Sequence, residues 1–148
     1  MKSLFDERAR AGMLDRVARL TPGHHGLWGR MNAGQMLVHT ADQLRMALGD
    51  LPCRPLPTPL RYPVLKQLVV YWLPWPKGTP TAPELRPRPF EGDWEAARAS
   101  LRAQVGRFAG RTPRDAWPEH PAFGRLSGRA WGVLSWRHLD HHLRQFGV

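Results

Sequence analysis

The stretch SGRAWGVLSWRHLDHHLRQFG, residues 127–147, is the strongest structural signal in the chain. Its apolar side chains recur every three or four residues, which is the period of an α-helix with one buried face. We therefore expect a helix that begins near Ser127 and runs to about Phe146. Two neighbouring stripes of this helix consist of Trp136, Leu139, Leu143 and Phe146, and of Trp131, Leu134, His138, His142 and Gln145.

A first helix is expected near the N-terminus, from about Ser3 to Leu20. Ser3 can cap it, and Asp6 follows three residues later, as in a capping box. The tripeptide TPG at 21–23 would stop it, because proline and glycine both disfavour the continuation of a helix.

Two more helices are bounded by clear capping signals. One begins at Asn32, has Gln35 three residues on, and ends at Gly49, a residue type that favours the left-handed conformation after a helix. The other spans about Trp94 to Ala109 and is preceded by Asp93 as its cap. Both carry apolar side chains at helical spacing.

Four amphipathic helices with long connections predict an all-α fold, a four-helix bundle that forms a single domain over residues 1–148. The 42% hydrophobic content agrees with one domain that buries its own core. Residues 52–93, between the second and third helices, are rich in proline. Within them the apolar run 64–73 predicts a short helix or a buried segment, and the tryptophans and prolines favour an ordered loop packed across the domain.

The formal net charge is +10, and the basic residues are spread along the whole chain. A nucleic-acid-binding surface normally concentrates them, so we expect no specific nucleic-acid partner. The longest apolar stretch is too short to span a bilayer and no secretory signal is visible, so we expect no membrane partner. The single cysteine, Cys53, cannot form an internal disulfide, which favours a cytoplasmic location.

Three of the seven histidines could form a metal site. His138 and His142 are four residues apart on one helix, so both side chains can point at the same ion. Such pairs also occur as packed or solvated side chains. His39 lies beside the apolar stripe of the second helix and is the candidate third ligand, with a buried, hydrogen-bonded histidine as the alternative. His141 competes with His142, and otherwise belongs near the site or its pocket.

The remaining histidines fall in predicted loops. We expect His24 and His25 to face solvent. His120 lies between prolines, which favours a structural role, with a place at the mouth of a site as the alternative.

The blocks WGRMNAGQMLVHTADQLRMALG, residues 28–49, and HPAFGRLSGRAWGVLSWRHLDHHLRQFG, residues 120–147, resemble the DinB/YfiT-like superfamily of metalloenzymes. The resemblance covers nearly the whole chain. It is closest to a DinB-like branch of unassigned function in which the LPWPKGTPTAPEL segment, residues 73–85, recurs.

This resemblance implies a four-helix bundle, often a homodimer, with a divalent metal held by one histidine of the second helix and two of the last. Carried over to this chain, the ligands are His39, His138 and His142. Gln145 matches a glutamine that follows the pair in many relatives, whereas Arg144 replaces a glycine that often precedes it.

Three neutral imidazoles would leave a metal its full charge and an open coordination position, which can activate water or a thiol. The resemblance further implies a low-molecular-weight thiol as co-substrate. We therefore expect a metal-dependent transferase or hydrolase acting on a small molecule, with a non-catalytic metal- or ligand-binding protein as the alternative. Zinc and nickel are the first candidates for the metal, and iron and copper follow.

Some neighbours of the three histidines could support the site. Asp42, three residues after His39, is a candidate hydrogen-bond partner for it, with a surface residue as the alternative. Asp140 is offset from the His138–His142 face, so we expect it to be solvated. An apolar pocket beside the metal could be lined by Met36, Met46, Trp28, Trp131 and Trp136, although packing in the core or at its rim is the first role of each.

Overall fold

The computed structural model describes residues 1–77 and 81–148, and within them it is all-helical, without a β-strand. Residues 78–80, in the LPWPKGTPTAPEL segment, lie outside the described residues. The helices in chain order are α1 (Glu7–Arg19), α2 (Ala33–Leu48), η1 (Pro59–Arg61), α3 (Pro63–Gln67), η2 (Leu68–Trp72, a π-helix), η3 (Pro83–Leu85), α4 (Trp94–Ala109) and α5 (Gly128–Gln145).

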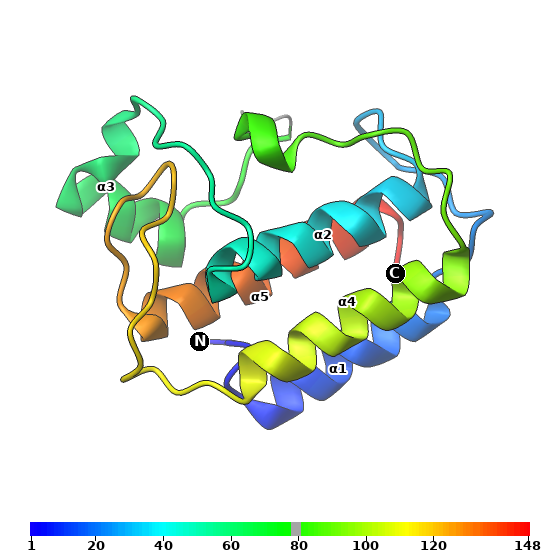
Figure 1. Ribbon diagram of the computed structural model, residues 1–148, viewed down its shortest axis with the longest axis horizontal. Helices are drawn as coiled ribbons and strands as arrows, with labels where there is room; N and C mark the ends of the chain where they lie inside the picture. The colour runs from blue at the N-terminus through cyan, green and yellow to red at the C-terminus, as the bar shows by residue number, and fades with distance from the viewer. Residues whose placement is uncertain (78–80) are drawn as a thin grey trace.

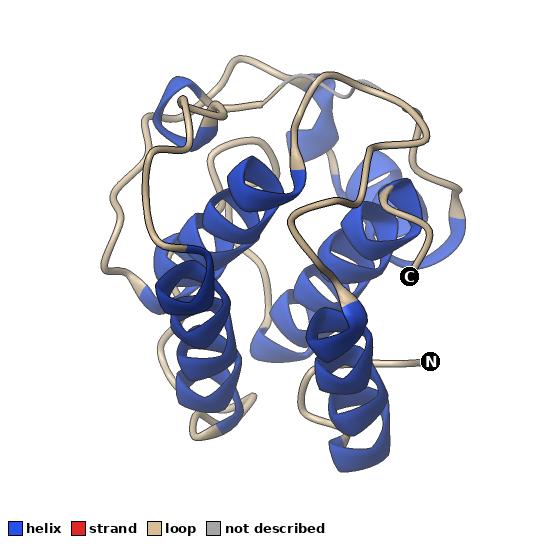
Figure 2. Ribbon diagram, turned by 90° about the vertical axis from the view of Figure 1, so that its right-hand side faces the viewer, coloured by secondary structure: helices blue, strands red, loops and turns tan. Residues whose placement is uncertain are grey.

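The four long helices contact one another in the cyclic order α1, α4, α2, α5. Figure 1 shows α4 alongside α1 and α2 alongside α5, and Figure 2 shows loops and short helices gathered over one side of them. Each long helix turns an apolar stripe toward the others, because burying these stripes together removes them from water. The largest fully buried side chains are Trp131, Phe108, Phe146, Leu4, Met13, Leu20, Met36, Leu37, Leu44, Leu101, Leu134 and Leu139.

The predicted boundaries of three long helices are confirmed. At the start of α2 the side chains of Asn32 and Gln35 form the reciprocal capping box, and Gly49 ends the helix with a φ of 89°. The Asp93 side chain accepts the hydrogen bond that caps α4. Ser127 caps α5 in the same way.

The predicted start of the first helix was wrong. α1 begins at Glu7, and Asp6 is its N-cap, accepting a hydrogen bond from the Ala9 N–H at 2.6 Å. Residues 3–5 instead form a turn, closed by the hydrogen bond from the Asp6 N–H to the Ser3 carbonyl at 3.1 Å, and this turn packs against α5. The Leu4 side chain is fully buried and its N–H donates to the Gly132 carbonyl at 3.1 Å.

The proline-rich connection, where it is described, is ordered by short helices. The apolar run 64–73 folds into α3 and η2, as the short-helix prediction states, but only Val70 in it is fully buried. The alternative of a buried segment was therefore wrong. In the part of the chain that the structure describes, no helix is long and apolar enough to cross a membrane.

Candidate metal centre

His39, His138 and His142 meet where α2 packs against α5. His39 lies in the middle of α2, and the other two lie one turn apart on α5. One potential ligand nitrogen from each of the three lies within 4.8 Å of the others. The Nε2 atoms of His39 and His138 are 3.2 Å apart. Such a spacing suits imidazoles that share one ion, because ligand nitrogens bind zinc at about 2.0–2.1 Å.

Two of the three rings are held in orientation by their outer nitrogens. His39 Nδ1 lies 2.9 Å from the Leu85 carbonyl oxygen, which can only accept, so Nδ1 donates and Nε2 keeps its lone pair. His142 Nδ1 lies 2.8 Å from Gln145 Oε1. The Gln145 amide in turn donates from Nε2 to the Trp28 carbonyl at 2.6 Å. Outer hydrogen bonds of this kind fix the tautomer and aim of metal-binding histidines.

The third ring has no such support. His138 Nδ1 is buried, and within residues 1–77 and 81–148 it has no hydrogen-bond partner. A buried polar nitrogen without a partner is costly, and such atoms require an explanation. Because His138 Nε2 lies 3.2 Å from His39 Nε2, a bound ion would hold the His138 ring through Nε2 and fix its orientation without an outer hydrogen bond.

The environment keeps the three imidazoles neutral. Burial lowers the pKa of His39, and burial together with the neighbouring His142 and His39 rings lowers that of His138 well below 6.5. Burial and the His39 ring lower the pKa of His142 to about 3. Neutral imidazole is the form that binds a metal, because protonation occupies the ligand lone pair.

Residues 5–147 match a family model described as a protein of unknown function, DUF1569. The chain belongs to the DUF1569 family. A search of the curated proteins found no match, and a search of the solved structures found none.

His141 of this DUF1569 chain lies outside the group of three. It is half-buried, and its ring packs against Trp28 and Trp75 with centroids 5.7 Å and 6.2 Å away. It lines the same pocket as the three histidines. The structure therefore places His141 in the wall beside the group.

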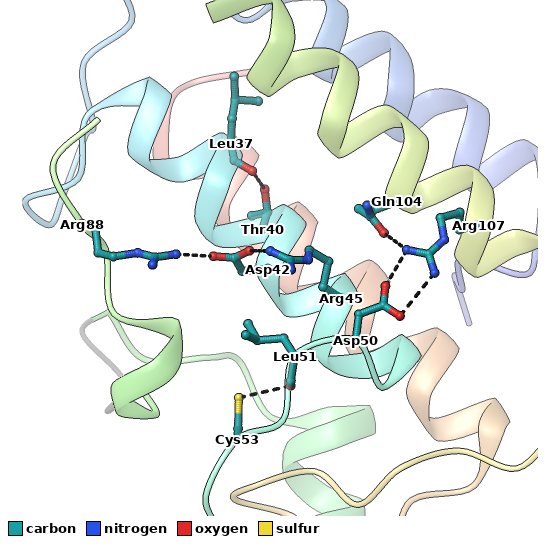
Figure 3. A network of polar contacts seen from close by, with 10 residues as sticks. All are labelled: Leu37, Thr40, Asp42, Arg45, Asp50, Leu51, Cys53, Arg88, Gln104 and Arg107. Atoms are coloured by element: carbon teal, nitrogen blue, oxygen red, sulfur yellow. Dashed lines mark hydrogen bonds and ion pairs between the residues drawn. The ribbon is translucent and has the colours of Figure 1, made fainter. Parts of the chain in front are cut away.

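Asp42 does not contact His39. Its carboxylate lies between two guanidinium groups, 3.0 Å from Arg45 and 3.2 Å from Arg88 (Figure 3). The candidate hydrogen bond from His39 to Asp42 is not formed, because the Asp42 carboxylate is paired with both arginines. The Leu85 carbonyl is the partner instead.

Asp140 departs from expectation, whereas Met36 takes the first of its two expected roles, packing in the core. Asp140 is only partly exposed and forms ion pairs with Arg16 and Arg144, whereas we expected it to be solvated. Met36 is fully buried in the core and does not line the pocket. Of the other pocket candidates, Trp28 and Met46 line it and Trp131 and Trp136 do not.

The three histidines form one wall of a pocket of about 310 Å³. The remaining walls are mainly apolar, as is usual in sites for small molecules. They come from the proline-rich connection, from α2 and α5, and from the loop before α5. Among the lining residues are Leu56, Leu60, Val69, Trp75, Ala122 and Phe123.

From the sequence, the role of His120 was left open between two alternatives, and Gln43 and Leu85 were not expected to contribute to the pocket, yet all three line it. His120 lines it, and its Nδ1 accepts hydrogen bonds from the N–H groups of Ala122 and Phe123. Gln43 lines it too, one turn after His39, and that spacing could have revealed it. Leu85 contributes a carbonyl, for which a sequence carries no signal because every residue has one.

The loop histidines at 24 and 25 lie away from the group. His24 is half-buried and its Nδ1 lies 2.8 Å from the Thr21 hydroxyl, so only His25 is exposed as expected.

Proposed function

We propose that His39, His138 and His142 hold a divalent metal ion, and that the chain is a DinB/YfiT-type four-helix bundle using this ion as a metalloenzyme. The observation that carries the proposal is the convergence of three neutral imidazoles from two helices. The outer hydrogen bonds of two of them direct Nε2 toward the shared point.

Three imidazoles fit zinc, nickel, iron or copper by the softness of the ligand, and zinc and nickel are our first choices. A bound ion would supply Lewis acidity, which lowers the pKa of a water or thiol placed on it. The chain provides neutral ligands that leave the charge of the ion undiminished. It also provides an apolar wall that limits the access of water to the reacting groups.

The shape of the pocket supports a small substrate. Its volume suits a small organic molecule, and its lining favours one with an apolar body. We propose a transfer reaction in which a low-molecular-weight thiol loses its proton, its sulfur bonds to an electrophilic carbon of such a substrate, and the bond from that carbon to a leaving group breaks, with the leaving group taking up the proton. Hydrolysis, in which water displaces the same leaving group, is the nearest variant. Gln43 and His120 are the polar groups placed to orient the substrate.

Elemental analysis of the untagged protein, purified without chelator, tests the metal site. We expect close to one metal ion per chain in the wild type and none in a folded His39→Ala, His138→Ala, His142→Ala triple variant. A His24→Ala, His25→Ala double variant is the control, because it removes histidines that lie outside the group. The absence of metal in the wild type after incubation with zinc and with nickel would refute the proposal.

Activity is tested next on the metal-loaded protein. Candidate thiols are screened with small electrophiles, and turnover should disappear in the triple variant. If metal binds but no thiol or water reaction is found above the triple-variant background, the enzymatic part of the proposal fails and the metal-binding part stands.

A further inference from the structure

One short segment carries most of the large apolar side chains that the chain exposes. It consists of α3, η2 and the residues beside them, and its exposed members, here called the 62–73 face, are Tyr62, Val64, Leu65, Leu68, Trp72 and Leu73. Val64 and Trp72 keep 71% and 72% of their surface exposed. Soluble proteins rarely expose such side chains together, and a patch of this kind marks an interaction surface.

These side chains share one side of the segment. Leu65, Leu68 and Trp72 are three and four residues apart, which places them in one row along the helical turns. The opposite side faces the protein, since Val70 is buried and Val69 lines the pocket.

The segment is fixed in this orientation by α5. The Arg137 guanidinium donates from Nη1 to the carbonyl oxygens of Val69 and Val70, both at 2.8 Å, and from Nη2 to that of Leu73. It also lies over the Trp75 ring, 5.4 Å from its centroid. Rotation of the exposed side chains into the protein would break these contacts, so the 62–73 face stays outward.

The segment that forms the 62–73 face and the segment beside it carry basic residues and no acidic ones. Residues 51–83 contain no aspartate or glutamate, and neither do residues 120–139. The two segments come together where Lys66 Nζ donates to the Arg125 carbonyl at 2.8 Å and Arg61 donates to the Pro121 carbonyl at 3.1 Å. Figure 1 shows α3 beside the loop that leads into α5. Arg61, Lys66 and Arg125 thus flank the apolar face.

We infer that the 62–73 face docks on an anionic lipid bilayer, with its apolar side chains in the interface and the flanking cations over the headgroups. Tryptophan and tyrosine favour the interface of a membrane, and aliphatic side chains beside basic residues are typical of segments that lie in it. This inference replaces our expectation of no membrane partner. It is independent of the metal site.

Charge disfavours a second copy of the chain on the 62–73 face, and the apolar side chains disfavour nucleic acid. A second copy joined by twofold symmetry would set Arg61, Lys66 and Arg125 against their own equivalents, and the two segments contain no acid to pair with them. Nucleic acid would use the cations but would leave Val64, Leu65 and Leu68 in water, because phosphate backbones offer them no apolar partner.

Co-sedimentation of the full chain with vesicles tests the inference. Vesicles of pure phosphatidylcholine are compared with vesicles that contain one-third phosphatidylglycerol, at low and at high salt. We expect binding to the anionic vesicles that weakens as salt rises, because salt screens the attraction of the basic residues.

Two pairs of variants separate the apolar and the charged contributions. The Val64→Ser, Trp72→Ser double variant should lower partitioning on the order of tenfold. Its control is Leu27→Ser, at a side chain of equal exposure in the loop before α2. Arg125→Glu should lower partitioning about fivefold or more, and Arg102→Glu on α4 is its control.

Several results would overturn the inference. One is an absence of binding to anionic vesicles. Another is a control variant that loses as much partitioning as the variant it is matched with. A third is a loss of partitioning in Arg125→Glu but not in Val64→Ser, Trp72→Ser, which would indicate attraction by charge without insertion of the apolar side chains. Analytical ultracentrifugation adds one more. A dimer that the Val64→Ser, Trp72→Ser variant dissociates, in a chain that does not bind vesicles, would assign the 62–73 face to a second copy.

Discussion

At the scale of single residues, the outer nitrogens of the histidines decide which inner nitrogens can bind an ion. His39 Nδ1 is hydrogen-bonded to the Leu85 carbonyl, and His142 Nδ1 is hydrogen-bonded to the Gln145 side-chain oxygen. The Nε2 atoms of His39 and His142 therefore face the shared point. Gln145 is itself held by its bond to the Trp28 carbonyl. The site therefore depends on residues that never touch the ion.

The first prediction concerns Gln145. Gln145→Ala should weaken metal binding by about 10- to 100-fold, because His142 loses the acceptor that fixes its ring and its tautomer. Metal affinity is measured by competition with a chelator, and Gln104→Ala, at a half-buried hydrogen-bonded glutamine of α4, is the control. An unchanged affinity in Gln145→Ala would show that the helix alone orients His142.

The second prediction separates the neighbours at 141 and 142. His142→Ala should lose the bound metal, whereas His141→Ala should keep it, because only His142 shares the common point with His39 and His138. Metal content per chain after exhaustive dialysis is the measurement. The reverse result would make His141 the ligand.

At the scale of elements, close approach of the backbone places the N-terminal segment on α5. A Cβ atom added at Gly132 would lie 2.4 Å from Ser3 Oγ and 2.5 Å from the Phe5 ring. Glycine is therefore required for the fit between residues 3–5 and α5. Gly106, in contrast, is exposed on α4, and nothing lies within 4 Å of a Cβ built there.

The third prediction compares these two glycines. Gly132→Ala should lower the free energy of unfolding by about 1–3 kcal/mol, because a side chain is forced into occupied space. Gly106→Ala should raise it by roughly 0.5–1 kcal/mol through the better helix propensity of alanine. Urea unfolding of both variants is the measurement. Equal effects of the two would mean that the N-terminal segment moves aside without cost.

The fourth prediction concerns the attachment of α3 and η2. Arg137→Met should loosen residues 63–73, because the carbonyl groups of Val69, Val70 and Leu73 lose their shared donor. Trypsin should then cleave after Lys66 faster than in the wild type, while Arg129→Met, at an exposed arginine of α5, should leave the rate unchanged. Equal cleavage rates would show that apolar packing alone holds the segment.

At the scale of the whole molecule, buried histidines link stability to pH. The pKa values of His142 and His120 are lowered to about 3, mainly by burial, and burial also lowers those of His39 and His138. In the unfolded chain these imidazoles have their ordinary pKa of 6.5. Below that pH the imidazoles bind protons in the unfolded state but not in the folded state, so lowering the pH favours unfolding.

The fifth prediction follows from this sign. The metal-free protein should lose stability steadily as the pH falls from 6.5, before the carboxyl groups titrate near their ordinary pKa values of 4.5 for glutamate and 3.8 for aspartate. The urea midpoint, measured at a series of pH values, reports the loss. The His39→Ala, His138→Ala, His142→Ala variant should show a shallower slope in this window. An equally steep slope would assign the effect to His120 or to other groups.

The helices were predictable from the sequence because their determinants are local. Asn32 with Gln35, Asp93 and Ser127 lie next to the backbone groups that they cap, so their effect needs no distant partner. The spacing of His138 and His142 is local in the same sense. Residues 3–5 were mistaken for helix because their conformation is set by α5, which is remote in the sequence.

Most of the site and the outer surface were decided by the tertiary structure alone. The packing of α2 on α5 brings His39 to His138 and His142. The fold also places the Leu85 carbonyl beside His39. It pairs Asp42 with Arg45 and Arg88 instead. The composition of the run 64–73 was compatible with a short helix or a buried segment, and the fold makes it a short helix with most of its side chains exposed. The sequence by itself determines spacing along a helix, whereas the partner of a side chain depends on which distant segment arrives beside it, and that is settled by the packing of the whole chain.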